Sequence, residues 1–206
     1  MKAGRGLSPY ELMDEELVEM AQNGDRNAFT ILVKRYQDRI YNLIYRYVGN
    51  VEDALDLTQE TFIKAFVKLG EFRGNSKFYT WLYRIAVNAC IDFRRRERIS
   101  IVHWDDIKPN EFDRLDMDES MNSVDVVGED NNPEMHMLKS ELKQIVREAI
   151  SALPEHLRIV LILREYEDLS YEEIASIVGC RVGTVKSRLF QAREMLKRKL
   201  SPYISI

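Results

Sequence analysis

The sequence has few of the residues that build disulfide frameworks or metal centres. Its 206 residues include two cysteines, at positions 90 and 180, and three histidines, at positions 103, 136 and 156. The cysteines lie far apart in apolar-patterned segments, which suits reduced packing residues better than a disulfide. The histidines are spaced apart, which argues against a zinc site. We therefore expect no metal and no cofactor.

Long apolar runs are also missing from the sequence. No segment approaches the roughly 20 apolar residues that span a bilayer, and the opening MKAGRGLSPYELMDEEL lacks the apolar stretch of a secretory signal. The 45% hydrophobic share is nevertheless enough to build a globular core. These features predict a globular protein of the cytoplasm.

The net charge of −4 conceals a strong segregation of charge along the chain. Residues 99–137 contain eleven Asp or Glu against Lys108 and Arg114, a local charge of −9, so the rest of the chain carries +5. Basic working surfaces are therefore compatible with an acidic total. We hypothesise that the acidic segment screens those surfaces in the free protein.

The same acidic segment lacks helical periodicity and is polar, which indicates a linker. One alternative is an enzyme, for instance a metal-dependent hydrolase that uses the aspartates at 105, 106, 113, 116 and 118. That cluster has neither a glycine at the calcium-loop position nor a suitably spaced histidine, so we expect no catalytic site.

Helical periodicity dominates the remainder, and no strand pattern or internal repeat is visible. Asp25 is a suitable N-cap for a helix whose apolar residues recur at spacings of three and four. A further helix is expected from about Val51 to Leu69, with Gly70 as its stop, and another from near Ser76. Asn132-Pro133 predicts the start of a second helical unit.

We therefore predict an all-α protein of two small helical domains joined by an acidic flexible linker. The expected divisions are an N-terminal tail (1–13), a first domain (14–98), the linker (99–131) and a second domain (132–200).

A helix-turn-helix is predicted within the second domain. Ser170 and Glu173 form a capping box, Gly179 supplies the turn, and Ala175 allows close helix crossing. The segment from Arg181 to Lys199 contains seven Lys or Arg residues and one acidic residue, Glu194. The outer face of the second helix carries short polar and cationic residues suited to the major groove: Thr184, Lys186, Ser187, Arg188 and Gln191. The simpler alternative is a solvated basic face.

Aromatic and cationic residues are interleaved between Arg73 and Arg98, where seven cations accompany only Asp92 and Glu97. Exposed aromatics beside cations suit single-stranded DNA, because bases stack while the backbone is neutralised. In the alternative interpretation Trp81 and Tyr83 are core residues and the arginines stabilise a helix C-terminus. For Trp81 we favour the core.

An acidic and polar face is expected on the helix that begins near Val51. Helical spacing gathers Asp53, Asp56, Gln59 and Glu60 on one side, opposite Leu57, Phe62 and Phe66. Such a face would repel DNA, so it suits a protein partner. A plain solvated face is the default alternative.

Three motifs in this order resemble those of extracytoplasmic-function sigma factors, a two-domain class of bacterial initiation factors within the sigma-70 family. They are EDALDLTQETFIKAF (52–66), FRGNSKFYTWLYRIAVNACIDFRRR (72–96) and LPEHLRIVLILREYEDLSYEEIASIVGCRVGTVKSRLFQAREML (153–196). The resemblance covers both helical units, and the three motifs together are far more specific than a lone helix-turn-helix.

The resemblance implies three binding surfaces and no catalytic site. The residues that match those contacting the clamp helices of the largest RNA polymerase subunit are Asp53, Asp56, Gln59 and Glu60. The residues that match those binding single-stranded minus-ten DNA are Arg73, Asn75, Lys77, Tyr79, Asn88, Asp92, Arg95 and Arg96. The loop from Arg73 to Lys77 matches the region that holds an extruded base. The residues that match those binding duplex minus-thirty-five DNA are Arg181, Thr184, Lys186, Ser187, Arg188 and Gln191.

The family also implies further partners. Part of the second domain binds the polymerase flap, and an anti-sigma factor, often membrane-bound, restrains the sigma factor; no small-molecule substrate is implied. Two residues depart from the family pattern: Arg181 stands where Ser or Pro is usual, and Val87 where a polar residue is common. The alternative function is a helix-turn-helix regulator that acts without entering the polymerase.

Overall fold

The computed structural model describes residues 12–104 and 133–203, with side chains over 12–97 and 141–203. These residues form helices joined by turns and contain no strand, which confirms the predicted all-α class. The aspartates of the acidic segment from 105 onward and the N-terminal tail to residue 11 lie outside the described residues. No helix within 12–104 or 133–203 is long and apolar enough to cross a membrane.

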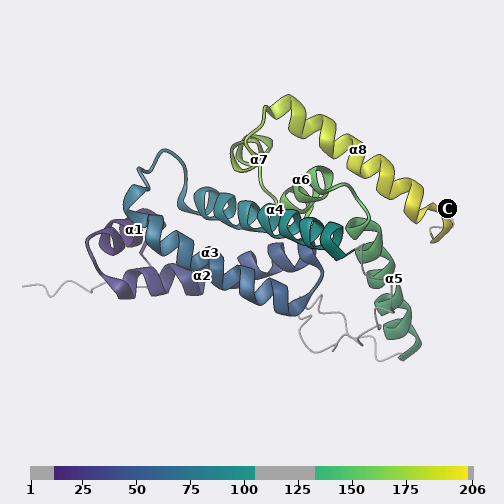
Figure 1. Ribbon diagram of the computed structural model, residues 1–206, viewed down its shortest axis with the longest axis horizontal. Helices are drawn as coiled ribbons and strands as arrows, with labels where there is room; N and C mark the ends of the chain where they lie inside the picture. The colour runs from purple at the N-terminus through teal and green to yellow at the C-terminus, as the bar shows by residue number, and fades with distance from the viewer. Residues whose placement is uncertain (1–11, 105–132, 204–206) are drawn as a thin grey trace, which may run out of the picture.

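Two groups of helices correspond to the two predicted units (Figure 1). The first contains α1 (Asp14–Gln22), α2 (Arg26–Val48), α3 (Val51–Lys68) and α4 (Phe78–Trp104). The second contains α5 (Pro133–Ser151), α6 (Glu155–Glu165), α7 (Tyr171–Val178) and α8 (Val182–Leu200).

Helix boundaries follow local capping chemistry where the sequence provides it. The Asp25 carboxylate accepts hydrogen bonds from the backbone N–H groups of Asn27 and Ala28, at 2.8 and 3.3 Å, and begins α2 as predicted. The Asn50 side chain accepts from the Asp53 N–H at 3.0 Å and begins α3. Each cap satisfies donors that the first helical turn leaves without partners.

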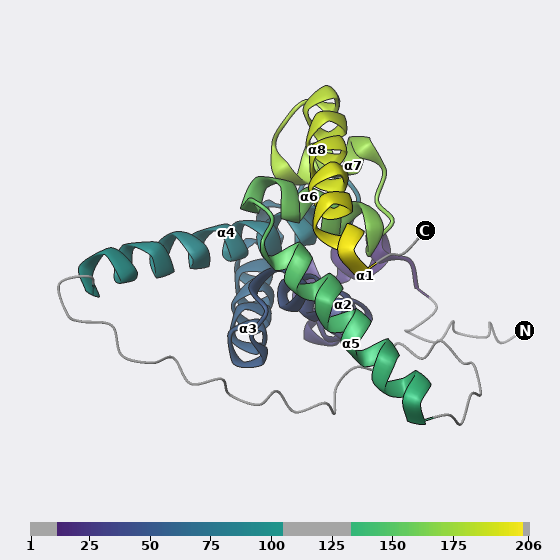
Figure 2. The same ribbon diagram turned by 90° about the vertical axis from the view of Figure 1, so that its right-hand side faces the viewer.

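Two boundaries differ from the sequence-based expectation. Helix α3 ends at Lys68 and passes into a 3-10 turn, Leu69–Glu71, so Gly70 lies within a tighter helical turn and does not end the helix with a left-handed residue. Helix α4 continues to Trp104, beyond the point where apolar periodicity fails, and Figure 2 shows its distal part extending beyond the other helices. A helix needs an apolar stripe only where it is packed, so the loss of that stripe does not mark its end.

The two units share one apolar core instead of forming separate ones. Buried residues of α1 to α4 and of α5 to α8 belong to a single contiguous cluster. Helix α4 lies between the two groups in Figure 1, and its Leu82, Ala86 and Cys90 are completely buried. The sequence predicted two tethered units but not their direct packing.

The predicted helix-turn-helix is present as α7 and α8. The Ser170 hydroxyl accepts from the Glu173 N–H, while the Glu173 carboxylate accepts from the Ser170 N–H at 2.9 Å, so the capping box is confirmed. Gly179 ends α7 in the left-handed region at φ 67°. Val185, Leu189 and Ala192 of α8 are buried behind the turn.

We predict that Gly179→Ala lowers the free energy of unfolding by about 1–2 kcal/mol, because a Cβ disfavours the left-handed conformation. An added Cβ would meet no heavy atom within 4 Å at Gly179 or at Gly183, so the loss reports backbone strain and not a clash. The matched control is Gly183→Ala, inside α8, which should be neutral or stabilising. Equal urea midpoints for the two variants would contradict this account.

Candidate nucleic-acid interface

The exposed side of α8 carries the polar residues that the sequence assigned to duplex DNA. Its inner stripe faces α6 and α7, which leaves Ser187 and Gln191 exposed and Thr184 half-buried. These three fall on one side of the helix, at spacings of three and four residues. Hydroxyl and amide groups of this kind match the donors and acceptors of base edges in a major groove.

Cationic side chains flank that polar stripe on both sides. The Lys186 ammonium is exposed and lies 5.8 Å from the centre of the Tyr171 ring. Arg188 is half-buried on the opposite flank. Arg181 is exposed at the N-cap of α8 and provides no side-chain cap, as its identity led us to expect. Of the six assigned residues, Arg181, Lys186, Ser187 and Gln191 are exposed, and Thr184 and Arg188 are half-buried.

A second surface begins in the loop before α4. Arg73, Asn75 and Lys77 are all exposed there, around Gly74 at φ 69°. A recess of about 190 Å³ opens between this loop and α4, lined by Glu71, Phe72, Arg73, Asn75, Ser76, Trp81 and Arg84. The sequence had predicted this loop as the cradle for an extruded base.

Trp81 has both a packing role and an exposed face. Its ring centre lies 5.1 Å from that of Phe72 and 5.7 Å from that of Phe78, so the indole is held by the aromatic core. It is only half-buried, and it lines the recess. The core role that we favoured from the sequence is therefore incomplete, because the indole also offers a stacking surface.

Polar residues continue along the outer side of α4. Asn88 is exposed, and Asp92 forms an ion pair at 3.0 Å with Arg95, whose side chain is 72% exposed. Arg96 reaches the Glu60 carboxylate of α3 at 3.9 Å. Asp92 thus positions an exposed arginine, and Arg96 links the α4 surface to the acidic face of α3. Val87 is completely buried and is a core residue.

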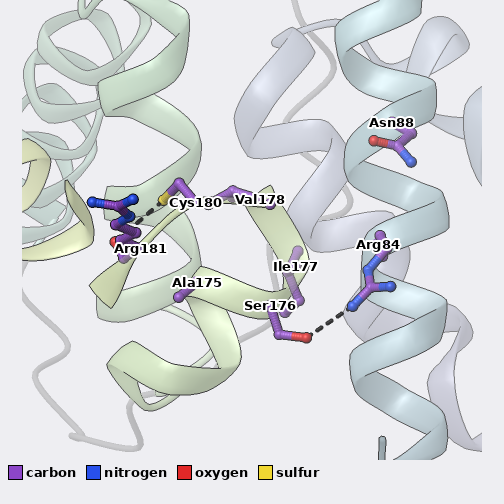
Figure 3. Close-up of a pocket in the computed structure, with 9 residues that line it drawn as sticks. Arg84, Asn88, Ala175, Ser176, Ile177, Val178, Cys180 and Arg181 are labelled. Carbon is purple, nitrogen blue, oxygen red and sulfur yellow. Dashed lines mark hydrogen bonds between the residues drawn. The ribbon is translucent and has the colours of Figure 1, made fainter. Parts of the chain in front are cut away.

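The N-terminal half of α4 faces the second unit. The Tyr79 hydroxyl donates a hydrogen bond to Glu173 of α7. Figure 3 shows the second bond, which Arg84 donates to the Ser176 hydroxyl at 2.8 Å. Burial raises the pKa of Tyr79, and the hydrogen bond to Glu173 adds to that effect. A cavity of about 570 Å³ lies here between α4 and the α7–α8 turn, with Asn88 and Arg181 both on its walls. Candidate residues of the two DNA surfaces thus lie on one cavity.

The acidic face predicted on α3 is present. Asp56 and Gln59 are exposed, while Asp53 is half-buried in the first turn. Glu60 forms an ion pair with Lys64 at 2.6 Å. Partial burial raises the pKa of Asp53, and the neighbouring Glu97 carboxylate raises it further. A cation brought to this face would relieve that repulsion.

The structure adds exposed apolar residues to the α3 surface. Ile63, Phe66 and Val67 are 64%, 51% and 74% exposed. Phe66 was expected on the inner side, but that side consists of Ala54, Leu57, Thr61 and Ala65. Phe66 instead lies at the edge, where its ring contacts Phe29 at 5.1 Å between centres. A surface that combines acidic and exposed apolar side chains is more typical of a protein-binding site than of a helix face that contacts only water.

Both helical units match known protein families. The sequence pattern of "Sigma-70 region 2" matches residues 32–99, and that of "Sigma-70, region 4" matches residues 143–196. The ECF RNA polymerase sigma-E factor of Escherichia coli strain K12 is 47% identical over 94% of this chain and 97% of its own length. The sigma-E factor of Haemophilus influenzae is 45% identical, over 93% and 97%. The RNA polymerase sigma-H factor of Pseudomonas aeruginosa is 43% identical, over 93% and 95%.

Solved structures share the fold at lower identity. CnrH, in complex with the cytosolic domain of CnrY, matches with a TM-score of 0.66 at 24% identity, covering 92% of this chain and 97% of the other. The sigma factor RpoE of Bartonella quintana, in complex with the anti-sigma factor NepR, gives 0.63 at 24%, covering 84% and 96%.

The two helical units, which match sigma-70 regions 2 and 4, define a protein of the bacterial initiation-factor class. Because relatives of 43 to 47% identity cover nearly the whole chain, the protein belongs to the extracytoplasmic-function sigma factors of the sigma-70 family.

Adjacent arginines on α4 should have separable roles. Arg94 is half-buried and donates to the Val48 carbonyl at 2.7 Å and to Glu97 at 2.6 Å, so it fastens α4 to the end of α2. We predict that Arg94→Ala lowers the free energy of unfolding by roughly 1–3 kcal/mol. Arg95→Ala should change it by less than about 0.5 kcal/mol. Chemical denaturation of both variants tests this, and equal losses would contradict it.

Proposed function

We propose that this chain joins core RNA polymerase as an alternative sigma factor and directs it to promoters of a particular sequence. The observation that carries the proposal is the combination on one chain of an acidic and apolar α3 face with separate DNA-facing surfaces on α4 and α8. The polymerase performs the chemistry, and this chain supplies recognition.

Polymerase docking is assigned to α3. Asp53, Asp56, Gln59 and Glu60 would face the clamp helices of the largest subunit, and Ile63, Phe66 and Val67 would lose water in the same contact. Burial of such apolar area supplies affinity, while the carboxylates set orientation and encounter rate. Part of the second unit would bind the polymerase flap.

Duplex recognition of the minus-thirty-five element is assigned to α8. Thr184, Ser187 and Gln191 would meet base edges, with Lys186, Arg188 and Arg181 beside them. A DNA phosphate near Arg181 would also occupy the uncapped, positive end of the helix.

Minus-ten recognition is assigned to α4 and its preceding loop. The recess beside Trp81 would hold an extruded base, with Arg73, Asn75 and Lys77 around it. Along α4, Tyr79, Asn88, Asp92, Arg95 and Arg96 complete the candidate surface. Exposed cations beside an indole suit a single strand, whose bases are free to stack.

Family membership also points to an anti-sigma factor as a partner. Both CnrH and the Bartonella RpoE were solved in complex with proteins of other chains, named CnrY and the anti-sigma factor NepR. We place this chain in the cytoplasm, where polymerase and promoter DNA are found. A helix-turn-helix regulator outside the polymerase is not favoured, since it would have no use for the α3 face.

We predict that Asp56→Arg with Glu60→Arg weakens retention of core polymerase by at least tenfold while leaving helicity unchanged. Both side chains lie on the proposed docking face, and reversed charge there opposes a complementary partner. The measurement is a pull-down of purified core enzyme. Asp38→Arg, which reverses one charge at an exposed position on α2, is the control and is compared with Asp56→Arg alone, the single variant of equal charge change. Unchanged retention by the double variant would remove α3 from the docking surface.

A second prediction separates phosphate contacts from base contacts on α8. Lys186→Ala should weaken binding to all duplexes alike and lower the salt slope by about one unit. Arg188→Ala should cost roughly 1–3 kcal/mol at one position of the minus-thirty-five element and alter sequence preference. Lys199→Ala, an exposed cation near the end of α8, is the control. The measurement is transcription in vitro from a set of altered promoters at two salt concentrations. If Lys186→Ala and Arg188→Ala both transcribe every promoter as the parent protein does, α8 does not read the DNA sequence.

A further inference from the structure

One carboxylate of the second unit is buried among residues of the first. Glu167 lies in the turn between α6 and α7, yet its side chain is only 5% exposed. Its carboxylate accepts a hydrogen bond from the Tyr83 hydroxyl of α4 and from Arg39 Nε of α2 at 3.4 Å. Arg46 of α2 approaches its second oxygen at 4.0 Å. We call Glu167, Tyr83, Arg39 and Arg46 the Glu167 cluster.

Neighbouring contacts reinforce the same junction. The Arg46 guanidinium lies 4.4 Å from the centre of the ring of Tyr166, the residue before Glu167. Arg158 of α6 donates to the Tyr47 carbonyl in the last turn of α2, at 2.9 Å. Burial raises the pKa of Tyr83, and the Glu167 charge raises it further, so its hydroxyl remains protonated and able to donate. The junction therefore has directional contacts in addition to apolar packing.

This closed arrangement is incompatible with a promoter-bound one. The elements assigned to α4 and α8 are about 25 base pairs apart, which at about 3.4 Å per base pair is on the order of 85 Å. In the structure, α4 and α7 are joined by a 2.8 Å hydrogen bond between Arg84 and Ser176. The two units must separate before both elements can be bound, a step of the argument that rests on the proposed function.

We propose that the Glu167 cluster is a latch that holds the free protein closed and keeps the N-terminal part of the α4 surface, around Tyr79 and Arg84, against α7 until a partner separates the units. Tyr79 and Arg84, of which Arg84 also lines the recess, are hydrogen-bonded to α7 while the latch is shut. Opening returns Glu167 and the two arginines to water, where each is readily solvated.

The chemistry of the cluster explains why a single residue controls it. Glu167 is buried, whereas the side chains of Arg39 and Arg46 are 48% and 28% exposed. Neutralising the buried carboxylate removes its attraction to both arginines in the closed state, whereas the open state, in which all three groups are solvated, loses little. Apolar packing between the units is non-directional and tolerates a changed side chain better. Glu167 is the acidic member of the cluster, so its neutralisation removes the carboxylate that both Arg39 and Arg46 approach.

The test compares full-length Glu167→Gln with full-length Asp168→Asn by small-angle X-ray scattering. Asp168 is the adjacent residue, its side chain is 95% exposed, and it forms an ion pair at 3.5 Å with Arg164 of its own unit. Glu167→Gln should raise the open fraction at least tenfold and increase the radius of gyration at unchanged circular dichroism. Asp168→Asn should superimpose on the parent. Identical scattering from Glu167→Gln and the parent would overturn the latch.

A second variant guards against a purely local defect. Tyr83→Phe keeps the buried ring and removes only the hydroxyl that donates to Glu167, so it should open the protein less than Glu167→Gln does. The double variant should open by less than the sum of the two single effects, because the Tyr83 hydroxyl acts through its hydrogen bond to residue 167. Fully additive opening would show that they act separately and would contradict the latch.

A DNA measurement distinguishes failure of the latch from failure of the proposed function. The probe is a fluorescein-labelled, A/T-rich single strand of about 12 nucleotides, titrated by anisotropy. If the latch covers the minus-ten surface, Glu167→Gln binds the strand about tenfold more tightly than the parent or Asp168→Asn. Opening without tighter binding would confirm the latch and refute the assignment of α4 to single-stranded DNA.

Discussion

The packing of α4 against both helical units is the interaction on which the rest of the structure depends. Its inner side completes the core of α1 to α3, and its N-terminal half meets α7 through Tyr79 and Arg84. One helix therefore anchors a fold and carries a candidate DNA surface at the same time. Because the second unit occupies part of that surface, the state of the junction decides which residues DNA can reach.

Much of the fold follows from local chemistry that is visible in the sequence. The cap at Asp25, the capping box at Ser170 and Glu173, and the left-handed turn at Gly179 all depend on residues within a few positions of one another. Their outcomes are as predicted, because a helix terminus must satisfy its own N–H groups wherever it lies. The outer residues of α8 are also placed as expected, since burial of Val185 and Leu189 fixes the opposite face.

Features that depend on distant segments were not predictable in the same way. Phe66 was expected to be buried, but the small residues Ala54 and Ala65 form the inner side of α3 and leave the larger ring at its edge. Nothing near Glu167 in the sequence indicates that its charge would be buried against α2 and α4. Tyr79 is likewise an aromatic residue of the kind that stacks on bases, but its hydroxyl donates a hydrogen bond to Glu173 of the other unit. Such pairings arise only when the two units meet.

The function assigned to this chain is to give core RNA polymerase its promoter specificity. The most direct measurement is sequencing of the 5′ ends of transcripts made from genomic DNA by purified core polymerase, with and without the full-length protein. The account predicts a discrete set of new start sites that share one upstream element near minus ten and another near minus thirty-five. Start sites identical to those of core polymerase alone, from protein that is folded and retained by the enzyme, would contradict it.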